Sequence, residues 1–335
     1  MKEANEIRKL NAKTKNRKWL FLVIPIFFFV SFTYCQAQKL SSPEKNFEFF
    51  WNTFNKYYPN FKIRKVDWQE QYKKYRPLVT KNTTDDELFN LLNEMVTPLR
   101  DGHIAISKTG DLPASAKYSS FHQQFPTKDS VNQLRAVIVE NLSSLGFADF
   151  IKFNSTFPIG GFSTSEQYGY LQLNGFGGMP LKAFEKQLDE MGLRFKNKKA
   201  VIIDIRINGG GEPAFVNAVV ARFSFEITGF DKPITLLTSG ASISAADHFA
   251  VNLMDFPNVT IIGERTAGMF SSMMGKKMPN GWEFSLSHET HLAKDGNNYE
   301  GVGIPVDIEI ANTKNNLATR NDPVLNKAFD FLKNK

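Results

Sequence analysis

Cysteine is almost absent from this sequence, since Cys35 is the single one among 335 residues. One thiol cannot form a disulfide within the chain, so a fold of this length must depend on its hydrophobic core. The G-x-G-x-x-G spacing of dinucleotide sites and the P-loop spacing with its lysine are also missing. Both absences disfavour a nucleotide site. Histidine is scarce, with five positions in all: His103, His122, His248, His288 and His291.

A long apolar run is missing as well. The run from Trp19 to Phe32 is shorter than the about 20 residues that a membrane-spanning helix needs. Basic residues precede it, and the small-residue segment that ends at Ala37 suits cleavage, so residues 1–37 are predicted to be a signal peptide. An uncleaved N-terminal membrane anchor is the alternative, whereas the large Tyr34 disfavours a lipoprotein signal. We therefore expect export to the periplasm or cell envelope, with secretion as a further option.

The positive charge of the chain is concentrated in the same segment. The whole chain has a formal charge of +7, and residues 1–37 hold seven basic and two acidic residues, so the remainder carries +2. This small excess gives no argument for nucleic acid or an anionic surface as a partner. Removal of the segment would also remove the only cysteine.

Residues 41–107 are rich in aromatic side chains and have helical periodicity. They predict an N-terminal helical subdomain over 38–108, in which the aromatic residues pack a core. Within it, Thr84 and Glu87 have the spacing of a capping box at the start of an amphipathic helix. Residues 109–166 are poorly patterned and are expected to connect the two regions and cover a cleft.

From residue 167 onward, strand and helix patterns alternate. Apolar runs at 168–174, 201–206, 234–238 and 259–262 have the character of buried strands, and amphipathic segments separate them. Repeated strand–helix–strand units predict an α/β fold with a parallel sheet or a right-handed superhelix. We expect one catalytic domain over 167–335.

Ser244 stands at the start of one of the predicted helices, shortly after the strand at 234–238 and Gly240. A serine there lies beside unpaired N–H groups and the positive end of the helix dipole, which would stabilise the oxyanion of an acyl transfer. Serine is also a favoured N-cap, so the position alone does not establish a nucleophile. The pattern nevertheless favours a serine hydrolase.

Two further segments suit such chemistry. The strand at 201–206 leads into Asn208-Gly209-Gly210-Gly211, where consecutive glycines can direct N–H groups at one anion. A plain strand-to-helix turn would have the same pattern. His103 follows the amphipathic helix on a glycine-containing turn, and it becomes a candidate base once a nucleophile is present elsewhere.

Taken in order, the segments around His103, Gly210 and Ser244, together with 263–268 and 299–307, resemble the C-terminal-processing and tricorn-core family of serine peptidases. The resemblance extends over about residues 47–332. It implies a crotonase-like α/β core, peptide or unfolded protein as substrate, and neither a metal nor an organic cofactor.

The resemblance also implies roles for individual residues. Ser244 would be the nucleophile, His103 the general base, and Glu300 the carboxylate that orients the imidazole and stabilises the imidazolium. The N–H groups of Ala245 and Gly210 would form the oxyanion hole. Gly210 is preferred over its neighbour because family members often have proline, which lacks an N–H, one position earlier.

Two departures from the family pattern matter. Processing peptidases have a dyad lysine directly after the Gly-x-x-Thr-x-Gly turn, but here Met269 and Phe270 follow it, which favours the Ser/His arrangement. The nearby Lys276 and Lys277 are expected in a solvated turn. Tricorn-like members have a serine immediately before the histidine, where this chain has Gly102, so the partner of His103 is either Asp101 or Glu300.

Other interpretations remain open at this stage. A non-catalytic member that binds an apolar ligand or a peptide could share the fold, and so could a crotonase-type acyl-CoA enzyme, although the latter does not explain Ser244 together with His103. His248 is expected to pack or to lie on the helix surface. His288 and His291 would point to opposite faces of a strand, which argues against a metal pair.

Overall fold

The computed structural model describes residues 41–111, 119–157 and 159–335. The predicted signal peptide lies outside these residues. Within them, no helix is both long and apolar enough to cross a bilayer. The chain has a mixed α/β architecture with a central, mostly parallel sheet, as the alternating pattern predicts.

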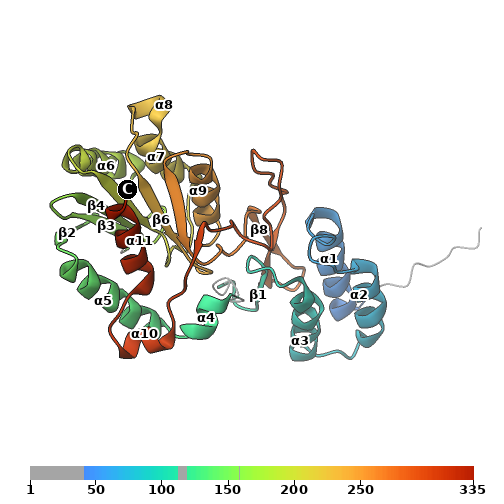
Figure 1. The fold of residues 1–335 in the computed structure, drawn as a ribbon. Helices are drawn as coiled ribbons and strands as arrows, with labels where there is room; N and C mark the ends of the chain where they lie inside the picture. Colours follow the sequence, from blue (N-terminus) through green and yellow to red (C-terminus); the bar gives the residue numbers. More distant parts are fainter. Residues whose placement is uncertain (1–40, 112–118, 158) are drawn as a thin grey trace, which may run out of the picture. The chain divides into compact units, whose positions relative to one another are not determined.

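The central sheet has seven strands in the order β10-β7-β6-β5-β4-β3-β2 (Figure 1). The strands are β2 (Ala148–Lys152), β3 (Gly160–Thr164), β4 (Tyr168–Leu173), β5 (Ala200–Asp204), β6 (Ile234–Thr238), β7 (Val259–Gly263) and β10 (Ile308–Glu309). The pairs from β4 to β7 and on to β10 are parallel, whereas β2 and β3 extend the other edge antiparallel. Parallel strands end at the same edge, so the loops after β5, β6 and β7 lie together.

Helices cover both faces of this sheet (Figure 1). One layer contains α6 (Leu181–Phe195), α7 (Pro213–Phe223), α8 (Phe225–Thr228) and α9 (Ala245–Met254), and the other contains α4 (Ser120–Gln124), α5 (Lys128–Ser144), α10 (Lys314–Ala318) and α11 (Pro323–Lys333). Alternate residues of one strand supply the two cores: Val201 and Ile203 join the cluster under α6, α7 and α9, while Ile202 joins the cluster under α5 and α11. This burial on both faces explains the unbroken apolar runs in the sequence.

The segment 109–166 does more than connect and cover, so that prediction needs correction. Its helix α5 packs on the sheet, and its strands β2 and β3 are part of the sheet. The strand pattern was hidden because β3 contains Gly160 and Gly161. A Cβ on Gly160 would lie 1.9 Å from the carbonyl oxygen of Gln172 on β4, so glycine is required where the strands approach closely.

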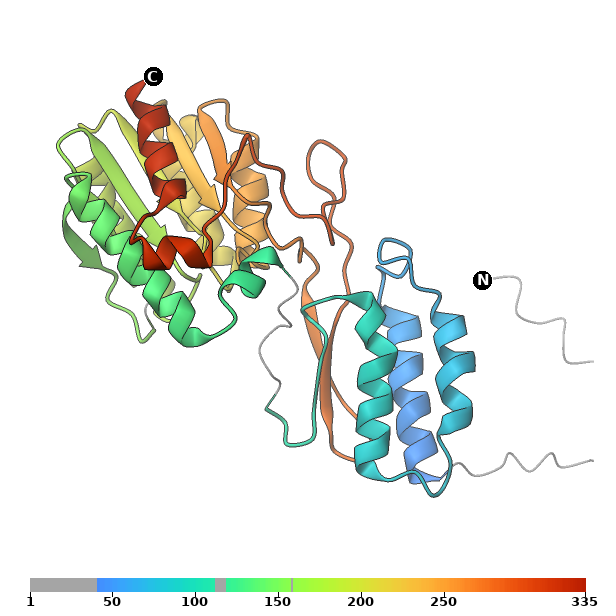
Figure 2. The same cartoon turned by 60° about the horizontal axis from the view of Figure 1, so that its bottom comes forward.

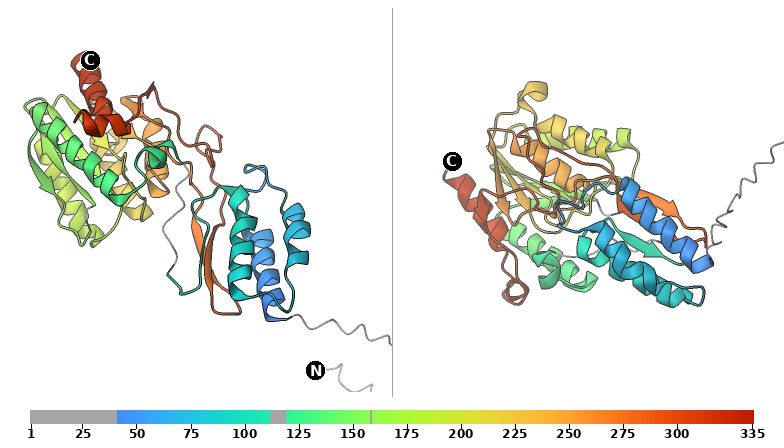
Figure 3. Two further views of the ribbon diagram at one scale, coloured as in Figure 1. Left: turned by 90° about the horizontal axis from the view of Figure 1, so that it is seen from below. Right: turned by 90° about the vertical axis from the view of Figure 1, so that its right-hand side faces the viewer.

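The N-terminal region contains α1 (Ser42–Tyr57), α2 (Trp68–Tyr75) and α3 (Asp85–Val96), with 3-10 turns at Arg76–Leu78 and Thr97–Leu99. The Thr84 hydroxyl accepts a hydrogen bond from the N–H of Glu87, which confirms the capping box at the start of α3. A separate sheet lies beside these helices, in the order β1 (Ala105–Ser107), β9 (Glu283–Ser287) and β8 (Met273–Lys277) (Figures 2 and 3).

This small sheet shows that a division of the chain at 108 and 167 is too simple. Phe284 of β9 packs against Phe50 and Phe54 of α1, with ring centroids 4.7 and 5.9 Å apart. Residues 273–287 therefore share their apolar core with the N-terminal helices and not with the seven-stranded sheet. Lys276 and Lys277 belong to β8 and not to a turn, and the ammonium of Lys276 lies 5.0 Å from the centre of the Tyr57 ring.

A buried ionic network anchors the C-terminal helix to the sheet. Arg206, just after β5, pairs with Asp204 and with Asp322, at 2.6 and 2.7 Å. All three side chains are almost fully buried, so each charge depends on the others for compensation. The network fixes the end of β5, directly before the glycine-rich loop.

Candidate active site

Ser244 lies on the turn between β6 and α9 in a strained backbone conformation. Its φ is 60° and its ψ is −113°, a region that residues other than glycine rarely adopt. Such a residue costs about 1–3 kcal/mol and persists only where its surroundings impose it. The nucleophile elbow of α/β-hydrolases is likewise a sharp, strained turn from strand to helix that exposes the serine hydroxyl.

Asp247 imposes this conformation from the first turn of α9. Its carboxylate is buried and accepts the N–H groups of Ser244 at 2.8 Å, Gly268 at 2.8 Å and Met269 at 3.1 Å. Burial raises the pKa of Asp247 to about 7, although these hydrogen bonds oppose the rise. One side chain thus joins the turn at Ser244 to the loop after β7. Asp247 was not predicted from the sequence, although its position three residues after Ser244 is typical of a capping box.

The glycine-rich loop lies directly against Ser244. Gly210 has φ 90°, and a Cβ there would lie 2.9 Å from the Cβ of Ser244 and 3.2 Å from the nitrogen of Ala245. The loop is held by Asn208, whose carbonyl oxygen accepts the N–H of Ile243 at 3.0 Å. The structure therefore brings together the two segments that were expected to supply the oxyanion hole.

One detail of that expectation needs correction. The N–H of Gly210 donates to the side-chain oxygen of Asn208 at 2.8 Å, so it is not free in this conformation. Within the part of the chain that the structure describes, the N–H groups of Gly211 and Ala245 have no hydrogen-bond acceptor. Ala245 directly follows Ser244 in the chain, and Gly211 directly follows Gly210.

His103 is buried on the turn after α3, and three neighbours determine its position. Its backbone N–H donates to Asp101 Oδ1 at 2.9 Å, and Asp101 Oδ2 accepts the Tyr58 hydroxyl at 3.0 Å. Its ring atom Nδ1 lies 3.4 Å from Ser287 Oγ at the end of β9. Burial lowers the pKa of His103; the negative Asp101 raises it and the positive Arg64 lowers it.

Glu300 is buried too, but it does not contact His103 directly. Its Oε1 accepts from Arg64 at 2.5 Å, and its Oε2 accepts the N–H groups of Phe270 and Ser271 at 2.8 and 3.0 Å. Burial raises the pKa of Glu300, with Asp101 raising it further and Arg64 opposing. Among the described residues, no hydrogen bond joins Glu300 to His103, so the role of Glu300 in orienting the imidazole stays a prediction. Ser287 is in contact with the ring instead.

The remaining histidines have structural contacts. His248 Nε2 donates to the carbonyl oxygen of Phe270 at 2.8 Å, and its ring centre lies 4.6 Å from that of His291. His288 Nδ1 bonds the carbonyl oxygen of Ser272 at 2.8 Å. The described residues contain no group of three or more His, Cys, Asp or Glu side chains that could hold a metal ion. They also include no hydrogen bond between Ser244 and His103.

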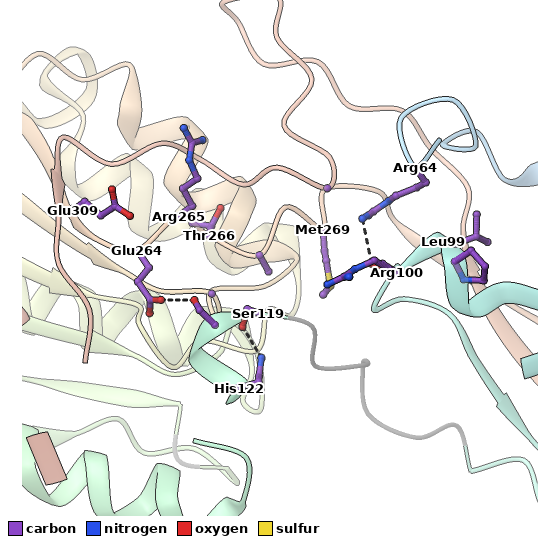
Figure 4. A pocket seen from close by; sticks show the side chains of 15 residues that line it. Arg64, Leu99, Arg100, Ser119, His122, Glu264, Arg265, Thr266, Met269 and Glu309 are labelled. Carbon is purple, nitrogen blue, oxygen red and sulfur yellow. Dashed lines mark hydrogen bonds between the residues drawn. The ribbon is translucent and has the colours of Figure 1, made fainter. Parts of the chain in front are cut away.

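A cavity of about 510 Å³ lies beside the loop after β7 (Figure 4). Thr266, Ala267 and Met269 form one part of its wall, and Arg64 and Arg100 contribute from the N-terminal region. Figure 4 shows Glu264, Arg265 and Glu309 at the opposite end. Met269 and Phe270 occupy the positions where a dyad lysine would follow the turn, and both side chains are buried.

Two segments of the chain match known protein families. Residues 41–97 match the Tricorn protease C1 domain, and residues 217–310, which include Ser244 and Glu300, match peptidase family S41. The chain is a serine peptidase, and residues 217–310 are similar to family S41. A peptidase acts on peptides or proteins, and Ser244 lies within the residues that match family S41.

Several solved structures have a similar fold. A peptidase structure from Parabacteroides merdae, titled as putative, shares 25% identity over 87% of this chain and 97% of its own, with a TM-score of 0.71. The tricorn protease shares 14% identity over 87% of this chain and 36% of its own, with a TM-score of 0.56. The photosystem II D1 C-terminal processing protease shares 14% identity over 81% of this chain and 94% of its own, with a TM-score of 0.51. At such identities the last two share the fold alone.

Proposed function

We propose that this serine peptidase is exported and hydrolyses peptide bonds through an acyl-enzyme on Ser244, with His103 as the general base. The observation that carries the proposal is the strained backbone of Ser244 at the start of α9, with Asp247 on one side and Gly210 on the other. Strain of this kind is retained where it positions a reactive group. A serine that served only as an N-cap would need no such conformation.

In the proposed reaction, Ser244 Oγ attacks the peptide carbonyl carbon and its proton passes to His103. The negative charge that develops on the carbonyl oxygen is stabilised by the N–H of Ala245 and by an N–H of the glycine loop. That second donor is Gly211, or Gly210 once its bond to Asn208 is released. The intermediate then expels the amine, which takes the proton from His103, and water attacks the ester to regenerate Ser244.

His103 has to come within hydrogen-bond reach of Ser244, and such contacts often tighten only when substrate is bound. Ser287 would hold the ring by its Nδ1 during this approach. Asp101 would act on the backbone of His103, and Glu300 through Arg64 and the amides of Phe270 and Ser271. The proposed role of Glu300 is therefore to order the loop that faces the histidine.

Export is proposed from residues 1–37, with their basic start, short apolar run and small-residue end. The expected compartment is the periplasm or cell envelope. We further propose that the seven-stranded sheet and its helices form a crotonase-like core, and that residues 38–108 form an N-terminal subdomain.

The test is hydrolysis of a mixed peptide pool by residues 38–335. We expect Ser244→Ala to abolish turnover, by on the order of a million-fold. His103→Ala should lose most of the rate, whereas Ser272→Ala, an exposed serine nearby, should behave as the unaltered protein. Circular dichroism confirms folding of each variant. Full activity in either Ser244→Ala or His103→Ala would refute the proposed mechanism, and no turnover by the folded unaltered protein would favour a non-catalytic binder.

A further inference from the structure

Arg64 lies on the loop between α1 and α2, and its side chain is only 10% exposed. The planar guanidinium donates hydrogen bonds in two directions. Nη2 donates to Glu300 Oε1 at 2.5 Å, and Nη1 donates to the carbonyl oxygen of Arg100 at 3.2 Å. Figure 4 shows the second of these bonds at the edge of the 510 Å³ cavity. One side chain thus joins two segments that are distant in the sequence.

The first of these segments carries His103. Arg100 has a left-handed backbone with φ 47°, and it directly precedes Asp101, whose Oδ1 accepts the N–H of His103 at 2.9 Å. The N–H of Ile104 closes the same turn, since it donates to the carbonyl oxygen of Asp101 at 3.2 Å. The bond from Arg64 therefore holds the start of the short turn on which His103 lies.

The second segment leads to Ser244. The N–H of Gly301, the residue after the glutamate, donates to the carbonyl oxygen of Gly268 at 2.7 Å. The N–H of Gly268 donates to Asp247, which also accepts the N–H of Ser244. A Cβ at Gly301 would lie 2.9 Å from Nη1 of the guanidinium, so the backbone packs directly against it. A continuous series of contacts therefore connects the guanidinium to the backbone of Ser244.

The charge of Arg64 also acts on His103. Burial lowers the pKa of His103; Asp101 raises it, and the positive Arg64 lowers it further. Two more titratable groups are close by: the hydroxyl of Tyr58, which donates to Asp101, and the imidazole of His248, which interacts electrostatically with the ring. A general base must be neutral to accept a proton, so the charge of Arg64 favours the form of the imidazole that can act.

We propose that Arg64 is a positioning residue of the peptidase reaction, which fixes the turn of His103 relative to the loop that supports Ser244. The inference rests on the proposed function, because it needs these two residues as base and nucleophile. They come from separate segments, so proton transfer depends on how those segments are held, and a misplacement of about 1 Å can cost about a hundredfold in rate. The fork of arginine holds two acceptors in a fixed geometry, which the single ammonium of lysine does not reproduce.

Steady-state kinetics on one peptide from the pool test this role. Arg64→Lys keeps the charge opposite Glu300, so we expect it to fold and to lose kcat by about tenfold to a hundredfold, with KM within about twofold of the unaltered protein. Arg64→Met removes the charge as well, so the ionisation in its pH–rate profile should move to higher pH. Arg76→Met is the matched control, because Arg76 pairs with Glu44 and Glu48 in the same region, and it should leave both kcat and the profile unchanged.

An NMR titration of His103 needs no turnover and separates the two proposals. The imidazole should titrate at higher pH in Arg64→Met than in the unaltered protein, whereas Arg64→Lys should keep the original value. Circular dichroism checks folding, and Arg64→Lys decides if Arg64→Met does not fold.

The two proposals can fail separately. Full hydrolysis in Ser244→Ala or His103→Ala contradicts the mechanism, whatever the titration gives. Loss of hydrolysis in those two variants, together with unaltered kcat in folded Arg64→Lys, an equal loss in Arg76→Met or an unshifted titration in folded Arg64→Met, contradicts the role of Arg64 and leaves the mechanism standing.

Discussion

Asp247→Asn offers a sharp test of how the turn at Ser244 is held in its conformation. The carboxylate accepts two N–H groups on Oδ2, from Ser244 and Met269, and one on Oδ1, from Gly268. An amide has one acceptor oxygen and one NH₂ donor, so at least one buried N–H loses its acceptor whichever way the amide turns. An unsatisfied buried donor costs about 1–3 kcal/mol. We expect Asp247→Asn to lose this much stability relative to the unaltered protein at low pH, where Asp247 is neutral.

The pH dependence of this loss has a definite sign. Burial raises the pKa of Asp247 from 3.8 to about 7 in the folded state. A raised carboxyl pKa means that folding favours the protonated form, so this group contributes most to stability below pH 3.8 and progressively less as the pH rises to about 7. A difference of about three pKa units corresponds to about 4 kcal/mol. Asparagine cannot ionise, so the variant lacks this decline.

The measurement is urea unfolding of the unaltered protein and Asp247→Asn across the range from pH 4 to pH 8, followed by tryptophan fluorescence. We expect the variant to be less stable at low pH, and the difference to narrow by up to about 4 kcal/mol, or to reverse, by pH 8. Asp330→Asn, an exposed position on α11, is the control and should give a constant difference. A stability difference between the unaltered protein and Asp247→Asn that stays constant or widens as the pH rises would refute the reasoning.

Four further outcomes follow from the same contacts. Ser287→Ala should lower turnover by about tenfold or more with little loss of stability, and Ser287→Thr should recover part of it, as steady-state kinetics and thermal unfolding would show. The rate should rise with pH through an ionisation below 6.5, because burial lowers the pKa of His103; a transition above 6.5 would contradict this. Glu300→Gln should remove the charge opposite Arg64 and cost about 3 kcal/mol of stability as well as activity. Arg206→Met should cost about 3–5 kcal/mol in urea unfolding, since Asp204 and Asp322 would then lack compensation; a cost below 1 kcal/mol would argue against the buried network.

The sequence was sufficient for the parallel part of the fold. Strands buried on both faces give unbroken apolar runs, so β4 to β7 were found within two residues of their observed ends. It was insufficient for β3, whose paired glycines remove the apolar signal. It was also insufficient for the placement of β8 and β9, because their contacts with α1 join residues more than two hundred positions apart.

Part of the candidate site could likewise be predicted from the sequence, and part could not. Local patterns located Ser244 at a helix start and Gly210 in a glycine loop, and the structure brings these two together. They could not reveal that the N–H of Gly210 is engaged by Asn208, because that depends on a side-chain rotamer. The contact between Ser287 and His103 joins residues 184 positions apart, and no local pattern marks a serine at the end of a strand as a partner of histidine.

Labelling with a fluorophosphonate, followed by mapping of the tagged peptide by mass spectrometry, tests the central claim most directly. This probe reacts with an activated serine, so it reports on the nucleophile without knowledge of the substrate. The account predicts a tag on Ser244 that is lost in Ser244→Ala and strongly slowed in His103→Ala. A tag on Ser239 or Ser242, or no tag on the folded protein, would contradict it.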